Sequence, residues 1–246
     1  MVVRPARPSQ MVREAPGSTE KVAAPLASQI DRCRRCDLWR RATHGVTGEG
    51  PSPAQMMLVG EQPGDVEDRA GRPFVGPAGR VLDQLLVEAG LERGAVYVTN
   101  AVKHFKWEPR GKRRLHRRPT TVEIDACQVW LEQEILAVKP RILVALGATA
   151  ARALLHKVVT IESARRHVLG HPSGAHIFVT YHPSAVLRAE EGAKQTEGLV
   201  ASRSEACRRG SGGFPAIVRK DIAGPGFASG SDLGKELKEA PTHGPH

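Results

Sequence analysis

Four short apolar runs, each ending in a polar turn and separated from the next by a further segment, constrain the fold of this chain most. The runs are AQMMLVG at 54–60, AVYVTN at 95–100, RILVALG at 141–147 and HIFVTYHP at 176–183. Residues 77–90 carry apolar side chains on one helical face, and residues 120–140 open with a capping box and end at a proline. Because strands that alternate with helices pair in parallel and are covered on both faces, we predict an α/β protein. Its three α/β/α layers should surround a central, mainly parallel four-stranded sheet.

The 246 residues suffice for one substantial core with polar segments at both ends. Residues 1–26 and 193–246 are rich in small, polar and charged residues without sustained periodicity, so we expect a disordered N-terminal lead and a disordered C-terminal tail. One domain then remains at residues 27–192. It should open with a helix, LASQIDRCRRCDLWRRAT, that starts near Leu26 and carries a CxxC pair.

No apolar run is long enough to span a bilayer, and the first residues lack the apolar core of a secretory signal. We therefore expect a cytoplasmic protein that makes no contact with a membrane. We also expect it to be a monomer.

The positive charge of the chain is concentrated in one segment. Residues 101–120 contain eight Lys or Arg residues and a single Asp or Glu, within a formal net charge of +10 for the whole chain. Such a patch favours a polyanionic partner, most often nucleic acid. His116 lies inside it, in the run RGKRRLHRR at 110–118. Composition alone predicts that this histidine is one more polar residue of a phosphate-binding loop.

Polar side chains follow the predicted strands where each strand ends. In open α/β sheets, ligands bind at the carboxyl ends of the strands. If the predicted topology is right, one crevice receives the following five side chains: Glu61, Gln62, Asp65, Asn100 and His182.

Four motifs along the chain point to a known family. They are GEQPGDVEDRAGRPFVGPAGR at 60–80, YVTNAVKHFKW at 97–107, KRRLH at 112–116 and YHPSAVLR at 181–188. In this order they resemble the UdgX-type uracil-DNA glycosylases, close relatives of the iron–sulfur family 4 enzymes, over roughly residues 30 to 190. The resemblance implies a uracil-DNA glycosylase-like fold. It also implies an enzyme that excises uracil from DNA, with single strands preferred, and stays covalently bonded to the sugar in a single turnover.

The resemblance assigns the reading of the base to Asn100, Phe74 and His182. A side-chain amide suits uracil, because its carbonyl accepts a hydrogen bond from N3–H while its NH2 group donates to O4. Phe74 would stack on the flipped ring. The alternative is an aromatic side chain of the core, but the surrounding Gly71, Pro73 and Gly76 favour a loop residue. His182 would donate a hydrogen bond to O2 as negative charge builds up there. Ser184, in the same YHPS motif, is assigned to the substrate site.

The resemblance assigns the sugar chemistry to the GEQPGD loop and to the basic segment. Gly60 and Gly64 would supply backbone contacts to the substrate, with Gln62 and Asp65 near the sugar. The imidazole of His116 would bond to C1′ of the sugar as a nucleophile. Two further assignments accompany it: Glu61 would orient His116 or receive its proton, and Arg114 would contact phosphate or pack within the loop.

The cysteines predict a metal site. A CxxC pair such as Cys33 and Cys36 is typical of metal or redox chemistry in a cytosolic chain, and Cys127 could supply a third thiolate. On ligand type alone the fourth ligand is His104 or Cys207, and the metal is an iron–sulfur cluster or zinc. The resemblance implies a [4Fe–4S] cluster held by Cys33, Cys36, His104 and Cys127.

Two other functions fit parts of the sequence. A conventional family 4 glycosylase would release its product, but GEQPG and KRRLH argue against it. A catalytically silent iron–sulfur module that binds DNA would need only phosphate contacts, and the set of Glu61, Phe74, Asn100 and His182 argues against that.

Overall fold

The computed structural model describes residues 23–185 and 187–188, and its central sheet has five strands in the order β2-β1-β5-β7-β6. Four strands run parallel: β1 Met56–Gly60, β2 Val96–Asn100, β5 Ile142–Leu146 and β7 His176–Thr180. The predicted α/β class and parallel sheet are confirmed. The predicted number of four strands is wrong, because β6 (Leu169–Gly170) pairs antiparallel with β7 at the edge. A strand of only two residues contains no apolar run, so no pattern in the sequence predicts it.

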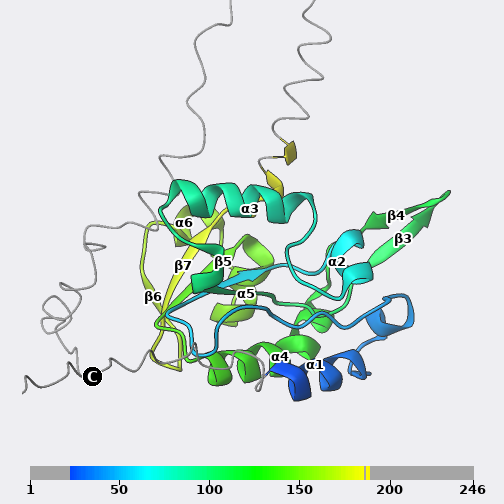
Figure 1. Ribbon diagram of the computed structural model, residues 1–246, viewed down its shortest axis with the longest axis horizontal. Helices are drawn as coiled ribbons and strands as arrows, with labels where there is room; N and C mark the ends of the chain where they lie inside the picture. The colour runs from blue at the N-terminus through cyan, green and yellow to red at the C-terminus, as the bar shows by residue number, and fades with distance from the viewer. Residues whose placement is uncertain (1–22, 186, 189–246) are drawn as a thin grey trace, which may run out of the picture.

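Helices cover both faces of this sheet (Figure 1). They are α1 Ala23–Asp31, α2 Asp65–Ala70, α3 Pro77–Glu88, α4 Thr121–Val138, α5 Ala148–Leu155 and α6 Ile161–Ala164, with 3-10 turns η1 Asp37–Arg40 and η2 Arg93–Ala95. Leu82 and Leu86 of α3 pack on one face of the sheet, while α4 and α5 contribute to the core on the other face. The three predicted layers are therefore present.

The alternation of side chains along β1 explains why both faces are apolar. Met57 and Val59 belong to the core cluster under α4 and α5, whereas Met56 and Leu58 belong to the cluster under α3. Successive strand residues point to opposite faces, so a strand covered on both sides reads as a continuous apolar run.

The predicted capping box of α4 is confirmed. Thr120 Oγ1 accepts a hydrogen bond from the Glu123 backbone at 3.4 Å, and the Glu123 carboxylate accepts one from the Thr120 backbone at 2.6 Å. The same carboxylate pairs with Lys106 Nζ at 2.8 Å, which ties the basic segment to the start of α4.

The prediction of one helix through the CxxC pair is wrong. Helix α1 ends at Asp31, and Cys33 and Cys36 lie in the turn between α1 and η1, where Cys36 has an extended backbone. A tertiary contact explains the break: Trp130 Nε1 of α4 donates a hydrogen bond to Cys33 Sγ at 3.1 Å. Holding this thiol against α4 requires the chain to turn away from the helix axis.

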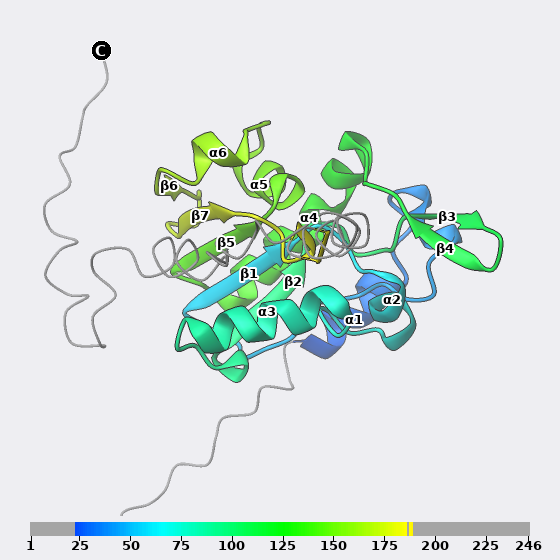
Figure 2. The same ribbon diagram turned by 90° about the horizontal axis from the view of Figure 1, so that it is seen from above.

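The segment predicted as a basic loop forms a β-hairpin. Strands β3 (Trp107–Arg110) and β4 (Arg113–His116) pair antiparallel, and Gly111 at the turn has a φ of 57°. Glycine adopts this left-handed conformation without the steric cost that other residues meet. The hairpin projects from the end of the molecule in both views (Figures 1 and 2).

The N-terminal lead and C-terminal tail fall mostly outside the described residues. Residues 1–22 and 193–246 are not described, while α1 begins at Ala23, inside the segment predicted as the lead. None of the helices in the described part of the chain has both the length and the apolar character needed to cross a membrane.

Candidate active site

A cavity of about 700 Å³ opens at the carboxyl ends of the parallel strands. It draws its lining from the loop after β1, from α2, from the end of β4 and from the segment after β7. Nine of the predicted site residues line it: Glu61, Gln62, Gly64, Asp65, Phe74, Asn100, His116, His182 and Ser184. Two further predicted residues contact these from behind, Gly60 beside Asn100 and Arg114 beside Asp65.

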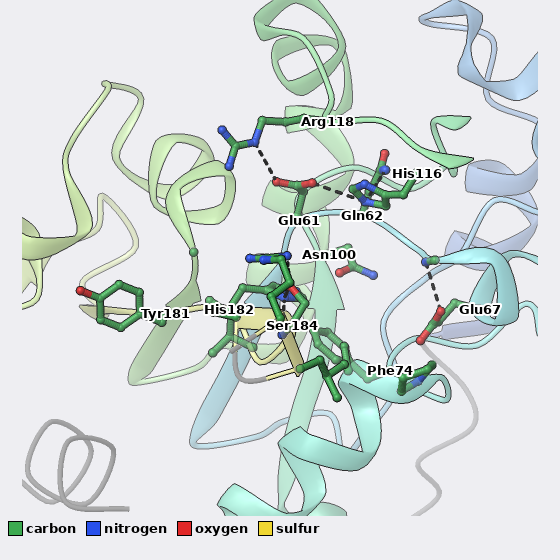
Figure 3. A pocket seen from close by; sticks show the side chains of 18 of the residues that line it. Glu61, Gln62, Glu67, Phe74, Asn100, His116, Arg118, Tyr181, His182 and Ser184 are labelled. Carbon is green, nitrogen blue, oxygen red and sulfur yellow. Dashed lines mark hydrogen bonds and ion pairs between the residues drawn. The ribbon is translucent and has the colours of Figure 1, made fainter. Parts of the chain in front are cut away.

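Asn100 presents a free amide at the floor of the cavity. Its side chain faces the space between His116 and Phe74 (Figure 3), and no other described group forms a hydrogen bond with that amide. Gly60 makes room for it: a Cβ there would lie 2.5 Å from Asn100 Oδ1 and 2.6 Å from the Phe74 ring. The close approach of these two side chains over Gly60 therefore requires glycine.

Phe74 is both a core residue and a wall of the cavity. Its ring is buried within the cluster under α3 and stacks on His182 with ring centroids 6.1 Å apart. Its φ of 53° is left-handed, a conformation that costs a residue with a Cβ free energy. Such strain is concentrated at functional sites, where the surrounding structure enforces it. Both interpretations of Phe74 from the sequence are compatible with this position.

The HPS motif fixes the tautomer of His182. The Ser184 backbone N–H donates to His182 Nδ1 at 3.1 Å, so Nδ1 is an acceptor and the ring proton lies on Nε2. Burial lowers the pKa of His182 to about 4, with smaller contributions from the positive charges of Arg188 and His116. At neutral pH the cavity therefore contains an uncharged imidazole with an N–H donor.

Gln62 fixes the orientation of His116 in a similar way. Gln62 Oε1 accepts a hydrogen bond from the Lys106 backbone at 3.1 Å, so its NH2 group is turned toward His116, with Nε2 atoms 2.8 Å apart. An amide NH2 group can only donate. His116 Nε2 is therefore the acceptor, and Gln62 occupies its lone pair at the edge of the cavity.

Burial favours the neutral form of His116. Partial burial is the largest cause that lowers the pKa of His116 below 6.5; Glu61 opposes it, and Arg188 and Arg118 lower it further. Glu61 Oε1 lies 3.5 Å from His116 Nε2, and Glu61 Oε2 lies 3.6 Å from Arg118 Nε (Figure 3). The second carboxylate oxygen also accepts a hydrogen bond from Thr149 at 2.6 Å. This contact holds the carboxylate beside the imidazole.

Arg114 anchors the hairpin that carries His116. Its guanidinium contacts the carboxylates of Asp65 and Asp68, the latter at 2.7 Å, and lies over the rings of Phe105 and Trp107. The Arg114 side chain is only 13% exposed. These contacts favour loop packing over phosphate binding for this residue.

Much of the basic segment is paired with acidic side chains of the protein itself. Besides Arg114, Lys103 is buried in an ion pair with Glu134, and Arg117 pairs with Glu108. Among the described residues, no ion pair involves the three cations at the hairpin tip, which are Arg110, Lys112 and Arg113. The tip is therefore the part of the segment best suited to meet a polyanion.

Three cysteines gather between η1 and α4. Burial is the main cause that raises the pKa of the Cys36 thiol and that of Cys127, the latter to about 12, and neighbouring thiolate charges add to both shifts. Backbone N–H groups of Arg35 and Lys103 donate to Cys33 Sγ and Cys127 Sγ at 3.5 and 3.4 Å. Hydrogen bonds to sulfur of this kind accompany thiolates that are bound to iron.

His104 follows Lys103 in the chain and is buried, and burial lowers its pKa. In the part of the chain that the structure describes, no three His, Cys, Asp or Glu side chains are grouped closely enough to hold a single metal ion. A cluster spaces its ligands more widely than a single ion, because each ligand binds a different iron atom. The donor set of three thiols and one imidazole suits either an iron–sulfur cluster or zinc. Cys207 lies outside the described residues.

Several residues of the site were not predicted from the sequence. Thr149 follows β5 in the GATA turn, a strand end at which no residue was singled out. Arg118 of the basic segment and Arg188 of the YHPSAVLR motif were given no role in the site, yet both line the cavity. Glu67 accepts hydrogen bonds from two loop glycines and so shapes the GEQPGD loop.

Comparisons with known proteins identify the family of this chain. The family model of the uracil DNA glycosylase superfamily matches residues 47–201. The type-4 uracil-DNA glycosylase of Pyrobaculum aerophilum is 38% identical over 174 residues, which are 66% of this chain and 83% of the relative. The type-4 enzymes of Thermotoga maritima and Archaeoglobus fulgidus are 37% and 32% identical, over 69% and 74% of this chain and 85% and 92% of theirs. This chain therefore belongs to the uracil DNA glycosylase superfamily.

Proposed function

We propose that this chain removes uracil from DNA and then remains covalently attached to the sugar through His116. The names of its relatives support the removal of uracil. One observation carries the covalent step: a neutral imidazole, with its Nε2 lone pair directed by Gln62, opens on the same cavity as Asn100 and His182. Water-dependent hydrolysis alone would not require this imidazole.

Uracil enters the cavity after it has been flipped out of the DNA. The Asn100 amide accepts a hydrogen bond from N3–H and donates one to O4, a pattern that cytosine reverses. Phe74 stacks on the ring, and Gly60 allows both side chains to approach the base. Single-stranded DNA is the preferred substrate, because no base pair has to be broken.

Cleavage of the glycosidic bond moves its electron pair onto uracil. The base leaves as an anion whose charge gathers at O2, where the Nε2–H group of His182 donates a hydrogen bond. A preorganised donor of this kind lowers the barrier by about 3 kcal/mol. The sugar is left with a positive, oxocarbenium-like C1′, which the Glu61 carboxylate stabilises.

His116 then captures the sugar. Its Nε2 lone pair first leaves the hydrogen bond with Gln62 and forms a bond to C1′. The alkylated ring carries one positive charge, which it loses by releasing the proton on Nδ1. No water molecule is consumed, so uracil departs with the original bonding electrons and the DNA stays attached to the protein.

A [4Fe–4S] cluster bound by Cys33, Cys36, His104 and Cys127 belongs to the proposal. Such a cluster supplies a covalent clamp between the CxxC turn and α4. The residues of the chain carry out every step at the base and the sugar.

Denaturing gel electrophoresis tests the proposed function. Protein is mixed with a labelled oligonucleotide that contains one uracil, and His116→Ala and a uracil-free oligonucleotide are run beside it. A shifted band that survives heat and detergent, and that needs both uracil and His116, is expected. Repeated excision without this band would identify a conventional glycosylase, and neither activity would leave only a DNA-binding module.

A further inference from the structure

A fully buried ion pair lies directly beneath the residue assigned to reading the base. The side chains of Lys103 and Glu134 are both 0% exposed, and Lys103 Nζ lies 2.6 Å from Glu134 Oε2. Lysine and glutamate are rarely this deeply buried, and replacing such a pair by apolar groups is often neutral or stabilising. The retention of the pair in this core therefore suggests a role other than stability.

The ammonium group of Lys103 satisfies all three of its N–H donors. They go to Thr99 Oγ1 at 2.7 Å, to the backbone carbonyl of Asn100 at 2.7 Å and to Glu134. An ammonium group has three donors and no acceptor, so these three hydrogen bonds fix the position of Lys103 Nζ. The contact that matters is the one with Asn100, because it fixes the peptide from which the base-reading amide projects.

Glu134 is held just as firmly on its other side. Its Oε2 atom also accepts a hydrogen bond from the Thr99 hydroxyl at 2.7 Å. Its Oε1 atom accepts from the Gly48 backbone at 2.7 Å and from Thr47 Oγ1 at 3.2 Å. The carboxylate is thus a fixed point of the core, while Lys103 keeps its own contacts with Thr99 and Asn100 at the end of β2.

The backbone after Asn100 has little other freedom. The Ala101 and Val102 backbones donate to the carbonyls of Gly60 and Glu61, at 2.9 and 3.0 Å. The Lys103 backbone donates to Cys127 Sγ. Lys103 therefore fastens a turn that carries the Asn100 amide of the pocket at one end and His104, a proposed cluster ligand, at the other.

We propose that Lys103 is a positioning residue that, through the carbonyl of Asn100, holds the Asn100 amide in the orientation that selects uracil over cytosine. This inference rests on the proposed function, because it takes Asn100 as the residue that reads the base. Lys103 itself touches neither the base nor the sugar. Its loss should therefore reduce the preference for uracil while leaving the contacts with phosphate unchanged.

The test uses two variants that share the loss of the carboxylate. Lys103→Met with Glu134→Gln removes both charges together, and the glutamine can still accept the Gly48 hydrogen bond. Glu134→Gln alone keeps the lysine and its contact with Asn100. Thr47→Val, which touches Glu134 on the side away from Asn100, is the matched control. Circular dichroism, thermal melting and visible absorbance report whether each variant is folded and holds its iron.

The readout is binding to DNA that cannot be cleaved. A fluorine at the 2′ position of the uracil nucleotide destabilises the positively charged sugar, so it blocks excision while leaving the base intact. The ratio of two dissociation constants, for an oligonucleotide with cytosine and for one with 2′-fluoro-2′-deoxyuridine, measures the discrimination between cytosine and uracil. We expect this ratio to fall about tenfold in the double variant, since one hydrogen bond that orients the amide is lost. Single-turnover excision should fall roughly a hundredfold, as for a misplacement of about 1 Å.

Each outcome bears on the proposal separately from the proposed function. A folded double variant that discriminates like the wild type overturns the role of Lys103, and so does a folded Glu134→Gln protein that loses discrimination. If the double variant does not fold, the discrimination measured for Glu134→Gln still tests the proposal, because this variant keeps the contact between Lys103 and Asn100. A wild-type protein that binds uracil and cytosine oligonucleotides equally would instead contradict the proposed function itself.

Discussion

The side-chain nitrogen of Gln62 lies 2.8 Å from Nε2 of His116, so a single hydrogen bond orients the imidazole and occupies its lone pair. The same Gln62 amide contacts the backbone of the hairpin at Lys106 and Arg117. The side chain that restrains the nucleophile therefore also fastens the hairpin that carries it.

Replacing Gln62 with alanine should lower the rate of crosslinking more than the rate of excision. The hairpin loses several backbone anchors, each worth about 1 kcal/mol, so we expect crosslinking to slow by roughly tenfold or more. Rapid-quench kinetics in a single turnover separates the two rates. Equal slowing of both would place Gln62 in base removal instead.

Crosslinking should depend on pH through His116. The nucleophile must be unprotonated, and its pKa is lowered from 6.5, so the rate should be constant near neutral pH. It should fall only when the solution becomes more acidic than pH 6.5. Arg118→Gln removes a positive charge that disfavours the imidazolium ion, so the pKa of His116 should rise and the acidic limb should move to higher pH. If the acidic limb of the pH profile did not move in this variant, Arg118 would not be lowering the pKa of His116.

Two arginines of the hairpin should behave differently. Arg114→Met leaves the buried Asp68 carboxylate without its cation, so we expect the free energy of unfolding to fall by about 3 kcal/mol, as measured by urea denaturation. Arg113→Ala should leave stability unchanged and reduce the salt dependence of binding to single-stranded DNA by about 0.7 in the log–log slope, the share of one phosphate. If Arg114→Met instead weakened only DNA binding, the anchoring role would be wrong.

Gly60→Ala should impair recognition of uracil. The added Cβ would meet Asn100 Oδ1 at 2.5 Å and the Phe74 ring at 2.6 Å, so one of them has to move. We expect a loss of about 2 kcal/mol in the free energy of unfolding, together with a large loss of excision. Gly94→Ala is the matched control, because a Cβ there meets nothing within 4 Å. Full excision by Gly60→Ala would show that this close approach is not needed.

The iron centre should depend on Cys127 and not on Cys207. Cys127→Ala removes a proposed ligand, so purified protein should lose visible absorbance and bound iron. Cys207→Ala should retain both. Loss of iron in both variants would identify Cys207 as the fourth ligand in place of His104, and zinc in place of iron by elemental analysis would contradict the cluster.

The layers of the fold could be predicted from the sequence because apolar periodicity reports burial directly. The runs that became β1, β2, β5 and β7 are apolar because both faces of these strands are covered. Short or polar elements gave no such signal. The hairpin was missed because charge dominates its sequence, although Gly111 marks its turn. The CxxC turn depends on a contact with Trp130, 97 residues from Cys33, which no local pattern contains.

The site could be predicted only in part from the sequence, for a similar reason. Motifs identify which residue types are present, but not which charges are neutralised by the fold. Lys103 and Arg114 were both counted in one basic patch, whereas the first is fully buried and the second is paired with two carboxylates. Their partners lie far away in sequence, so only the tertiary structure distinguishes an internal anchor from a cation that is free for DNA.

Peptide mapping of the crosslinked species tests the covalent role of His116 most directly. A protease that cleaves after glutamate, except before proline, releases residues 93–123, whose only histidines are His104 and His116. After nuclease digestion of the DNA, mass spectrometry should find the added sugar on this peptide, and fragmentation should assign it to His116. A sugar adduct on any other residue, or unmodified peptide in a protein that has excised its uracil, would contradict the account.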